Sequence, residues 1–91
     1  MIDKHNILGR LVEIEILPSA KRHKISETDI IHSLQQSIYD ETIQTDPNKT
    51  LSLGFDSKAR LLEIIFHVIT DSQIIVFHAM PCRKTYVERM Q

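Results

Sequence analysis

The sequence predicts an α+β fold in which one antiparallel sheet packs against a helix, in the element order β-α-β-β-β-α. Three observations lead to this fold class. Residues 11–17 alternate between apolar and charged side chains, a capped amphipathic segment follows, and three strand-like runs joined by short polar turns come next. With 91 residues, 42% of them hydrophobic, the chain fits a single domain over residues 1–91 with a modest core.

The first strand and the helix are marked by their local patterns. The alternation over residues 11–17 is typical of a half-buried strand, which Pro18 ends. Ser26 is placed as the helix N-cap, with Asp29 three residues later as a weaker form of the capping box. An apolar stripe at helical spacing then predicts a helix that continues to about Tyr39. The stripe consists of Ile30, Ile31, Leu34 and Ile38.

The second half of the chain is predicted to form two hairpins and a terminal helix. The polar segment 40–49 contains Asp-Pro-Asn and is predicted to be a loop. Three strands are expected after it, at 50–55, 60–69 and 74–79, joined by turns at 56–59 and 70–73. Residues 83–90 fit a short helix in which Tyr86 and Met90 lie one turn apart.

Tight turns fix which residues face each other in a hairpin, so the expected faces of the sheet can be derived. We pair Phe55 with Arg60 and Ile69 with Ile74. One face is then wholly apolar and is the predicted core: Leu51, Leu53, Phe55, Leu62, Ile64, Phe66, Val68, Ile75, Phe77 and Ala79. The opposite face is more polar: Ser52, Gly54, Glu63, Ile65, His67, Val76, His78 and Met80.

The charge balance argues against strong, indiscriminate binding to nucleic acid, because eleven basic and twelve acidic residues give a net charge of −1. The charges are unevenly distributed. Residues 26–48 carry five acidic and no basic side chains, whereas residues 80–91 carry three basic and one acidic. Two basic ends therefore flank an acidic middle. If the ends meet in space, they form a local patch that can hold a phosphate backbone.

The polar sheet face offers groups for proton transfer. His67 and His78 are candidates for an acid and a base that cleave RNA through its own 2′-hydroxyl, with Glu63 as an orienting carboxylate. Arg83 is the candidate cation for the phosphate. The alternative is that these are half-exposed strand residues on an ordinary solvent face. Candidates for contact with RNA are Lys21, Arg22, His23, Lys24, Lys84 and Tyr86.

Other classes of site lack a sequence signal. Cys82 is the only cysteine, so an internal disulfide and a zinc site built on paired thiolates are excluded, and we expect it to pack in the core. No zinc-protease motif and no glycine-rich phosphate loop is present. We expect neither a metal ion nor an organic cofactor.

Several short motifs carry a family resemblance. The segments Lys21-Arg22-His23-Lys24-Ile25, Leu61-Leu62-Glu63-Ile64, His78-Ala79-Met80 and Arg83-Lys84-Thr85-Tyr86 stand in the order found in small actinobacterial toxin-like proteins. Over about residues 15–91 the chain resembles the BrnT-like branch of the RelE and ParE toxin superfamily.

This resemblance implies a toxin of a type II toxin-antitoxin pair, which cleaves messenger RNA, in some cases on the ribosome, and thereby inhibits translation. It implies a cognate antitoxin protein as partner. It also suggests that His78, Arg83 and Tyr86 belong to the active region, with Lys21, Arg22 and His23 as further members.

A competing hypothesis is a non-catalytic interaction module, or degenerate toxin, that binds a partner or a second copy of itself through an exposed sheet face. The apolar residues expected there are Leu11, Leu17, Ile65, Val76 and Met80. The N-terminal decapeptide has no apolar segment of signal-peptide length and no run approaches the roughly 20 residues that span a bilayer, so a cytoplasmic location without membrane contact is expected.

Overall fold

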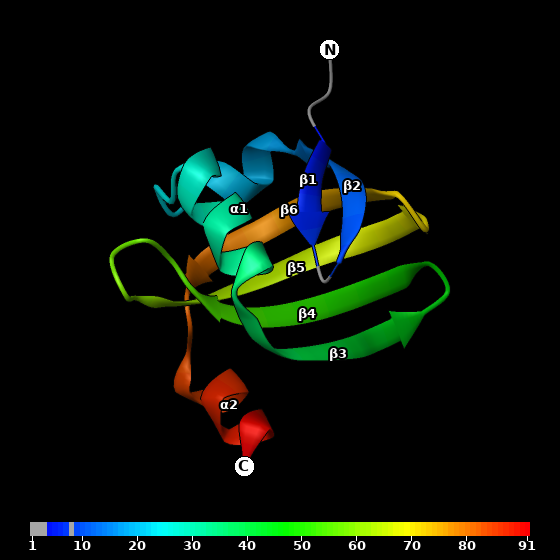
Figure 1. Cartoon of the computed structure of the whole chain (residues 1–91). Coiled ribbons are helices and arrows are strands. Elements are labelled where there is room, and N and C mark those ends of the chain that lie inside the picture. The colour runs from blue at the N-terminus through cyan, green and yellow to red at the C-terminus, as the bar shows by residue number, and fades with distance from the viewer. Residues whose placement is uncertain (1–3, 8) are drawn as a thin grey trace.

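A computed structural model describes residues 4–7 and 9–91 and shows a mixed α+β fold with a curled six-stranded sheet and few helices (Figure 1). Within these residues no helix is both long and apolar enough to cross a membrane. The elements, in chain order, are β1 Lys4–Ile7, β2 Arg10–Ile16, the 3₁₀ helix η1 Pro18–Lys21, α1 Glu27–Gln35, β3 Ser37–Thr45, β4 Asn48–Phe55, β5 Leu61–Thr70, β6 Gln73–Pro81, α2 Lys84–Val87 and the 3₁₀ helix η2 Glu88–Met90.

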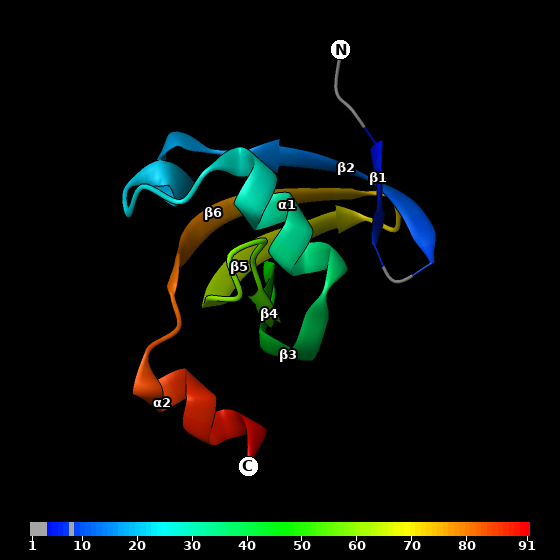
Figure 2. The ribbon, with the colours of Figure 1, turned by 60° about the vertical axis from the view of Figure 1, so that its left-hand side comes forward.

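The strands lie in the spatial order β1-β2-β6-β5-β4-β3. Four of the five neighbouring pairs are antiparallel, among them the two predicted hairpins β4–β5 and β5–β6. Strand β2 runs parallel to β6, so the sheet is not wholly antiparallel as expected. Two strands were not predicted, β1 and β3. Helix α1 lies across one side of the curled sheet, and α2 lies beyond the end of β6 (Figure 1 and Figure 2).

The start of α1 was predicted correctly and its end was not. The Ser26 hydroxyl accepts a hydrogen bond from the Asp29 amide at 3.1 Å, so Ser26 is the N-cap. The helix ends at Gln35, however, and the chain turns directly into β3, which leaves Ile38 56% exposed. The expectation of a loop at 40–49 was also wrong. An edge strand with one solvated side does not need the apolar alternation that marks central strands.

The β4–β5 hairpin differs from the predicted register by one residue. Phe55 lies opposite Leu61, not Arg60. The turn is one residue longer because the Asp56 carboxylate accepts hydrogen bonds from the amides of Lys58 and Arg60, and Ala59 adopts a left-handed φ of 61°. Since side chains alternate, this shift moves every β4 residue to the other face relative to β5.

The sheet therefore has an apolar cluster on each face, and the expectation of one polar face was wrong. The cluster beneath α1 includes the predicted residues Leu62, Ile64 and Ala79. It also contains Val12, Ile14, Ala20, Ile25, Ile30, Leu34, Ile74 and Val76, with Phe66 packed against it. The second cluster contains Leu51, Leu53 and Ile65, against which pack Tyr39, Leu61, Phe77, Cys82, Tyr86 and Met90.

Two further corrections concern side chains assigned to the wrong face. Ile65 lies opposite His78, as predicted, but the next pair is Phe66 with Val76, which leaves Phe77 as an extra, bulged residue. Phe77 consequently packs in the second cluster, and Val76 is fully buried beneath α1. The interaction surface expected from Ile65 and Val76 therefore does not exist as an exposed patch.

Candidate active site

Glu63 is the centre of a buried polar cluster that joins β5, β6 and the C-terminal segment. It lies near the start of β5, is fully buried, and projects into the face that holds the second apolar cluster. Its carboxylate accepts hydrogen bonds from the Arg83 main-chain amide at 2.9 Å, from the Arg83 guanidinium at 2.7 Å and from His78 Nε2 at 2.8 Å. Burial raises the pKa of Glu63, but these hydrogen bonds outweigh it and leave that pKa below its ordinary value.

His78 is oriented by this buried carboxylate. It lies near the end of β6, and its side chain is 23% exposed. Because an ionised carboxylate can only accept, the hydrogen bond from Nε2 places the proton of a neutral imidazole on Nε2. Its other nitrogen, Nδ1, has no hydrogen-bond partner among the described residues and carries the lone pair of the neutral ring.

Arg83 joins the start of the C-terminal helical segment to Glu63. Its Nε and Nη2 contact the carboxylate, while Nη1 makes no hydrogen bond to the described part of the chain and the side chain is 52% exposed. The guanidinium carbon lies 5.2 Å from the centre of the Tyr86 ring, within range for a cation–π contact. The ion pair raises the pKa of Arg83, which therefore keeps its charge. Three predicted site residues thus lie together, namely Glu63, His78 and Arg83, with Tyr86 beside them.

The segment after β2 brings a second imidazole to His78. The Ser19 hydroxyl donates a hydrogen bond to the Phe77 carbonyl at 2.7 Å, and the Leu17 amide donates to the Val76 carbonyl at 2.9 Å. These two bonds fasten η1 along β6. The chain then turns, and the exposed His23 ring packs edge to face on His78 with the ring centres 6.0 Å apart.

Several basic residues are close in the sequence to His23 and Arg83. Arg22 and Lys24 are exposed and form no ion pair with any described residue, and Lys24 adopts a left-handed φ of 63° at the turn. Lys21 is paired with Glu27, and Lys84, next to Arg83 in the chain, lies 4.0 Å from Glu88. We call Lys21, Arg22, Lys24, Arg83 and Lys84 the basic rim.

His67 does not belong to this cluster, contrary to the sequence expectation. Its ring stacks on Phe77 with the centres 4.6 Å apart, and its Nδ1 lies 3.1 Å from the Asn48 carbonyl oxygen. The bulge at Phe77 places that aromatic ring against His67. No hydrogen bond or ring contact within residues 4–7 and 9–91 joins His67 to Glu63 or His78.

Two further features bear on the chemistry of the site: the Cys82 thiol and the arrangement of possible metal ligands. Cys82 is half-buried against the second cluster, as expected of a packing thiol, and burial raises its pKa. Across the described ranges, no three His, Cys, Asp or Glu side chains are arranged to hold a metal ion.

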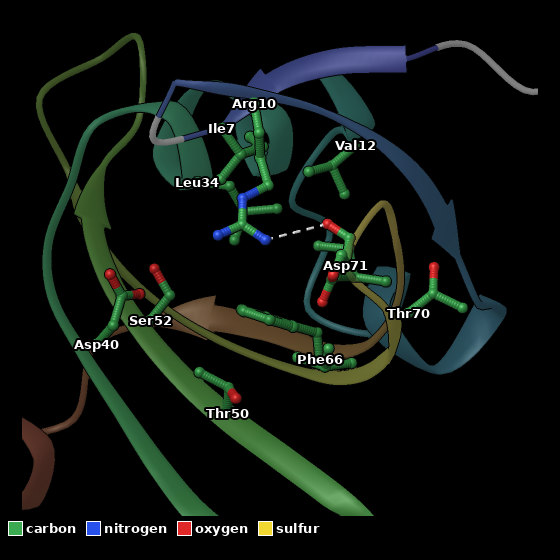
Figure 3. A pocket seen from close by; sticks show the side chains of 12 residues that line it. Ile7, Arg10, Val12, Leu34, Asp40, Thr50, Ser52, Phe66, Thr70 and Asp71 are labelled. Carbon is green, nitrogen blue, oxygen red and sulfur yellow. Dashed lines mark hydrogen bonds between the residues drawn. The ribbon is translucent and has the colours of Figure 1, made fainter.

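A separate cavity of about 260 Å³ lies on the α1 side of the sheet (Figure 3). Apolar side chains such as Val12, Leu34 and Phe66 line it, together with Arg10, whose guanidinium donates to the Asp71 carbonyl at 3.2 Å. No sequence feature indicated this cavity, since β1 and β3 were not predicted. None of its lining residues belongs to the Glu63–His78 cluster, so the cavity is separate from the candidate site.

A second ion pair fastens the C-terminus to the sheet edge and makes stability depend on pH. Arg89 contacts the Glu41 carboxylate of β3, and the Tyr39 hydroxyl donates to the same carboxylate at 2.7 Å. The hydrogen bonds from Arg89 and Tyr39 lower the pKa of Glu41 from 4.5 to about 2. A pKa lowered by folding means that the stabilisation is present above the unfolded value and disappears as the pH falls through the folded value.

We therefore expect the free energy of unfolding to fall between pH 4.5 and about 2, and to fall less in Arg89→Ala than in the wild type. Urea unfolding at a series of pH values measures both curves. Lys84→Ala removes one positive charge from the same segment without touching Glu41 and is the matched control. Parallel curves for Arg89→Ala and the wild type would show that the Glu41 pair does not couple to folding.

Comparison with known proteins identifies no relative: no family model, no curated protein and no solved structure matches the chain.

Proposed function

We propose that this chain is a RelE/BrnT-like toxin of a type II toxin-antitoxin pair and that it cleaves RNA by acid-base catalysis with His78. The observation that carries the proposal is the buried Glu63 carboxylate, which orients His78 at a partly open surface beside the guanidinium of Arg83. The four segments in which the sequence resembles that superfamily contribute the residues of this cluster and the adjoining His23 segment.

The tautomer of His78 suits the role of a base. With its proton held on Nε2 by Glu63, Nδ1 can accept the proton of a ribose 2′-hydroxyl. The 2′-oxygen then forms a bond to the adjacent phosphorus, and the bond from phosphorus to the 5′-oxygen breaks. The departing 5′-oxygen takes up a proton, so the products are a 2′,3′-cyclic phosphate and a 5′-hydroxyl. In this scheme Glu63 is a positioning residue, because it acts through His78.

The cations of the basic rim supply the other requirement, which is compensation of the charge on the five-coordinate phosphorus. Arg83 keeps Nη1 directed away from Glu63 and half of its side chain exposed, so it can contact a phosphate without leaving the carboxylate. Arg22 and Lys24 can hold neighbouring phosphates of the strand. This local patch allows RNA binding in a chain with a net charge of −1.

Induced expression in a bacterial host tests the function. We expect wild-type protein to arrest growth and to fragment RNA into products with 2′,3′-cyclic phosphate ends. His78→Ala should abolish both effects, because removal of a general base lowers the rate about 10²–10⁴-fold. His32→Ala is the matched control, since His32 lies on α1 and contacts only the Phe55 carbonyl among its described polar partners.

Two results would contradict the proposal. Arrest and RNA cleavage by His78→Ala at the wild-type level would remove His78 from the chemistry. Normal growth and intact RNA with well-expressed, folded wild-type protein would instead favour the non-catalytic interaction module. In the toxin proposal a cognate antitoxin neutralises the protein, and co-expression of a small protein encoded beside it should restore growth.

A further inference from the structure

We propose that His23 is the general acid of the same reaction and protonates the departing 5′-oxygen while His78 accepts the proton of the 2′-hydroxyl. This inference rests on the proposed RNA cleavage and deepens it by assigning the second proton transfer. The sequence had placed His67 in the acid-base pair and His23 among the RNA contacts. The arrangement in space favours the opposite assignment.

The distance between the two rings fits a pair that acts on one phosphate. A general acid or base must come within about 2.6–3.2 Å of the oxygen that it serves. The 2′- and 5′-oxygens lie on opposite sides of the same phosphorus during displacement, so the two catalytic rings must be close neighbours. The ring centres of His23 and His78 are 6.0 Å apart. Their edge-to-face packing, with the planes 74° apart, leaves the edges of the exposed His23 ring open to a substrate.

The environments of the two imidazoles differ in the way that a division of roles requires. His78 is held by a buried carboxylate that fixes one nitrogen as donor and leaves the other as acceptor. His23 is exposed, and neither of its nitrogens has a hydrogen-bond partner among the described residues. It stands between Arg22 and Lys24, whose charges can draw a phosphate to it. His67, by contrast, is occupied by Phe77 and by the Asn48 carbonyl.

The position of His23 is built into the fold. The Ser19–Phe77 and Leu17–Val76 hydrogen bonds fasten η1 to β6, and Ala20 of η1 is completely buried. The Lys24 amide donates to the Lys21 carbonyl at 3.1 Å and closes the turn that presents His23. Burial of Ile25 on the far side of the turn holds the other end. The His23 segment is therefore anchored on both sides.

Replacing the leaving-group oxygen distinguishes a general acid from a residue that only contacts the phosphate. The probe is a short oligoribonucleotide that contains the linkage cut by the wild type, made once with the natural 5′-oxygen and once with sulfur in its place. A thiolate departs without being protonated, whereas the 5′-oxygen needs an acid. We expect His23→Ala to cleave the oxygen linkage at least about 100-fold more slowly than the wild type, and the sulfur linkage within about threefold of it.

The other variants complete the test. His78→Ala should be slow on both linkages, because both require activation of the 2′-hydroxyl, and His32→Ala should match the wild type on both. Equal losses for His23→Ala on the two linkages, or no loss on either, would overturn the assignment of His23 while leaving the proposed ribonuclease intact. If the wild type cleaves no RNA, so that no such linkage can be identified, both proposals are overturned.

Discussion

Gly54→Ala is expected to lower the free energy of unfolding by about 3 kcal/mol or more, which corresponds to a drop of at least about 10 °C in the melting temperature of a domain of this size. Gly54 lies in β4 where the end of α1 crosses the strand, and a Cβ atom there would stand 2.2 Å from the Ser33 carbonyl oxygen and 3.1 Å from the Gln36 carbonyl oxygen. Both neighbours are main-chain atoms, so no rotation of a side chain can relieve the contact. Thermal unfolding followed by circular dichroism measures the effect.

The crossing at Gly54 is further fixed by a hydrogen bond from the Ser33 hydroxyl to the Gly54 carbonyl at 2.8 Å. The matched control is Gly9→Ala, because Gly9 has open space around it and a left-handed φ of 83°. There we expect a loss of about 1 kcal/mol from backbone conformation alone. Similar losses for the two variants would mean that α1 moves away from β4 easily and that the close approach does not limit stability.

Glu63→Gln is expected to cost about 2–4 kcal/mol of stability and to loosen the C-terminal segment. The glutamine amide keeps the shape of the side chain, but its nitrogen cannot accept a hydrogen bond. One of the two oxygens that accept from the Arg83 guanidinium, the Arg83 main-chain amide and His78 is therefore lost. All of these donors now converge on one buried carboxylate. Because folding lowers the pKa of Glu63, the variant should also lose part of the stability that the wild type gains as the pH rises through 4.5.

Urea unfolding and amide hydrogen exchange measure these effects separately. Exchange of the Tyr86 and Val87 amides, which donate to the Arg83 carbonyl, should accelerate more than exchange in α1. Glu88→Gln is the control: it removes the same charge from an exposed carboxylate 4.0 Å from Lys84 and should cost less than about 0.5 kcal/mol. A loss in Glu63→Gln no larger than that of the control would contradict the tethering role of Glu63.

Glu63→Gln also distinguishes a residue that orients His78 for catalysis from one that only stabilises the fold. If Glu63 orients His78, Glu63→Gln should reduce RNA cleavage in protein that is still folded, and Glu63→Asp should restore part of it. In the interaction-module hypothesis, Glu63 only ties α2 to the sheet. Its substitution would then change stability without any associated catalytic readout.

Most residues of the candidate site were predicted from the sequence, but their arrangement in space was not. Glu63 and His78 were selected because their strands were predicted to be neighbours, and β5 and β6 do pair at that end. Arg83, in the predicted terminal helix, was selected separately as a cation for the phosphate. Their relation was different from the expected one, since Glu63 is buried and its carboxylate accepts hydrogen bonds from both His78 and Arg83. The pairing of His23 with His78 had no sequence signal, because it depends on how η1 docks along β6.

The sequence by itself determined the local features: the cap at Ser26, the end of β2 before Pro18, the antiparallel hairpins of the second half and the short C-terminal helical segment. Each follows from interactions between residues close together in the chain, such as capping hydrogen bonds, turn conformation and apolar periodicity.

Only the tertiary structure decided the parallel pairing of β2 with β6, the edge strand β3 and the bulge at Phe77. The one-residue register shift at Asp56 is set locally, by hydrogen bonds within the turn. A strand with apolar residues on both sides has no preferred face of its own, so the hydrogen bonds of a turn and the packing of distant segments choose its register. That choice buried Glu63, separated His67 from the cluster and placed His23 beside His78.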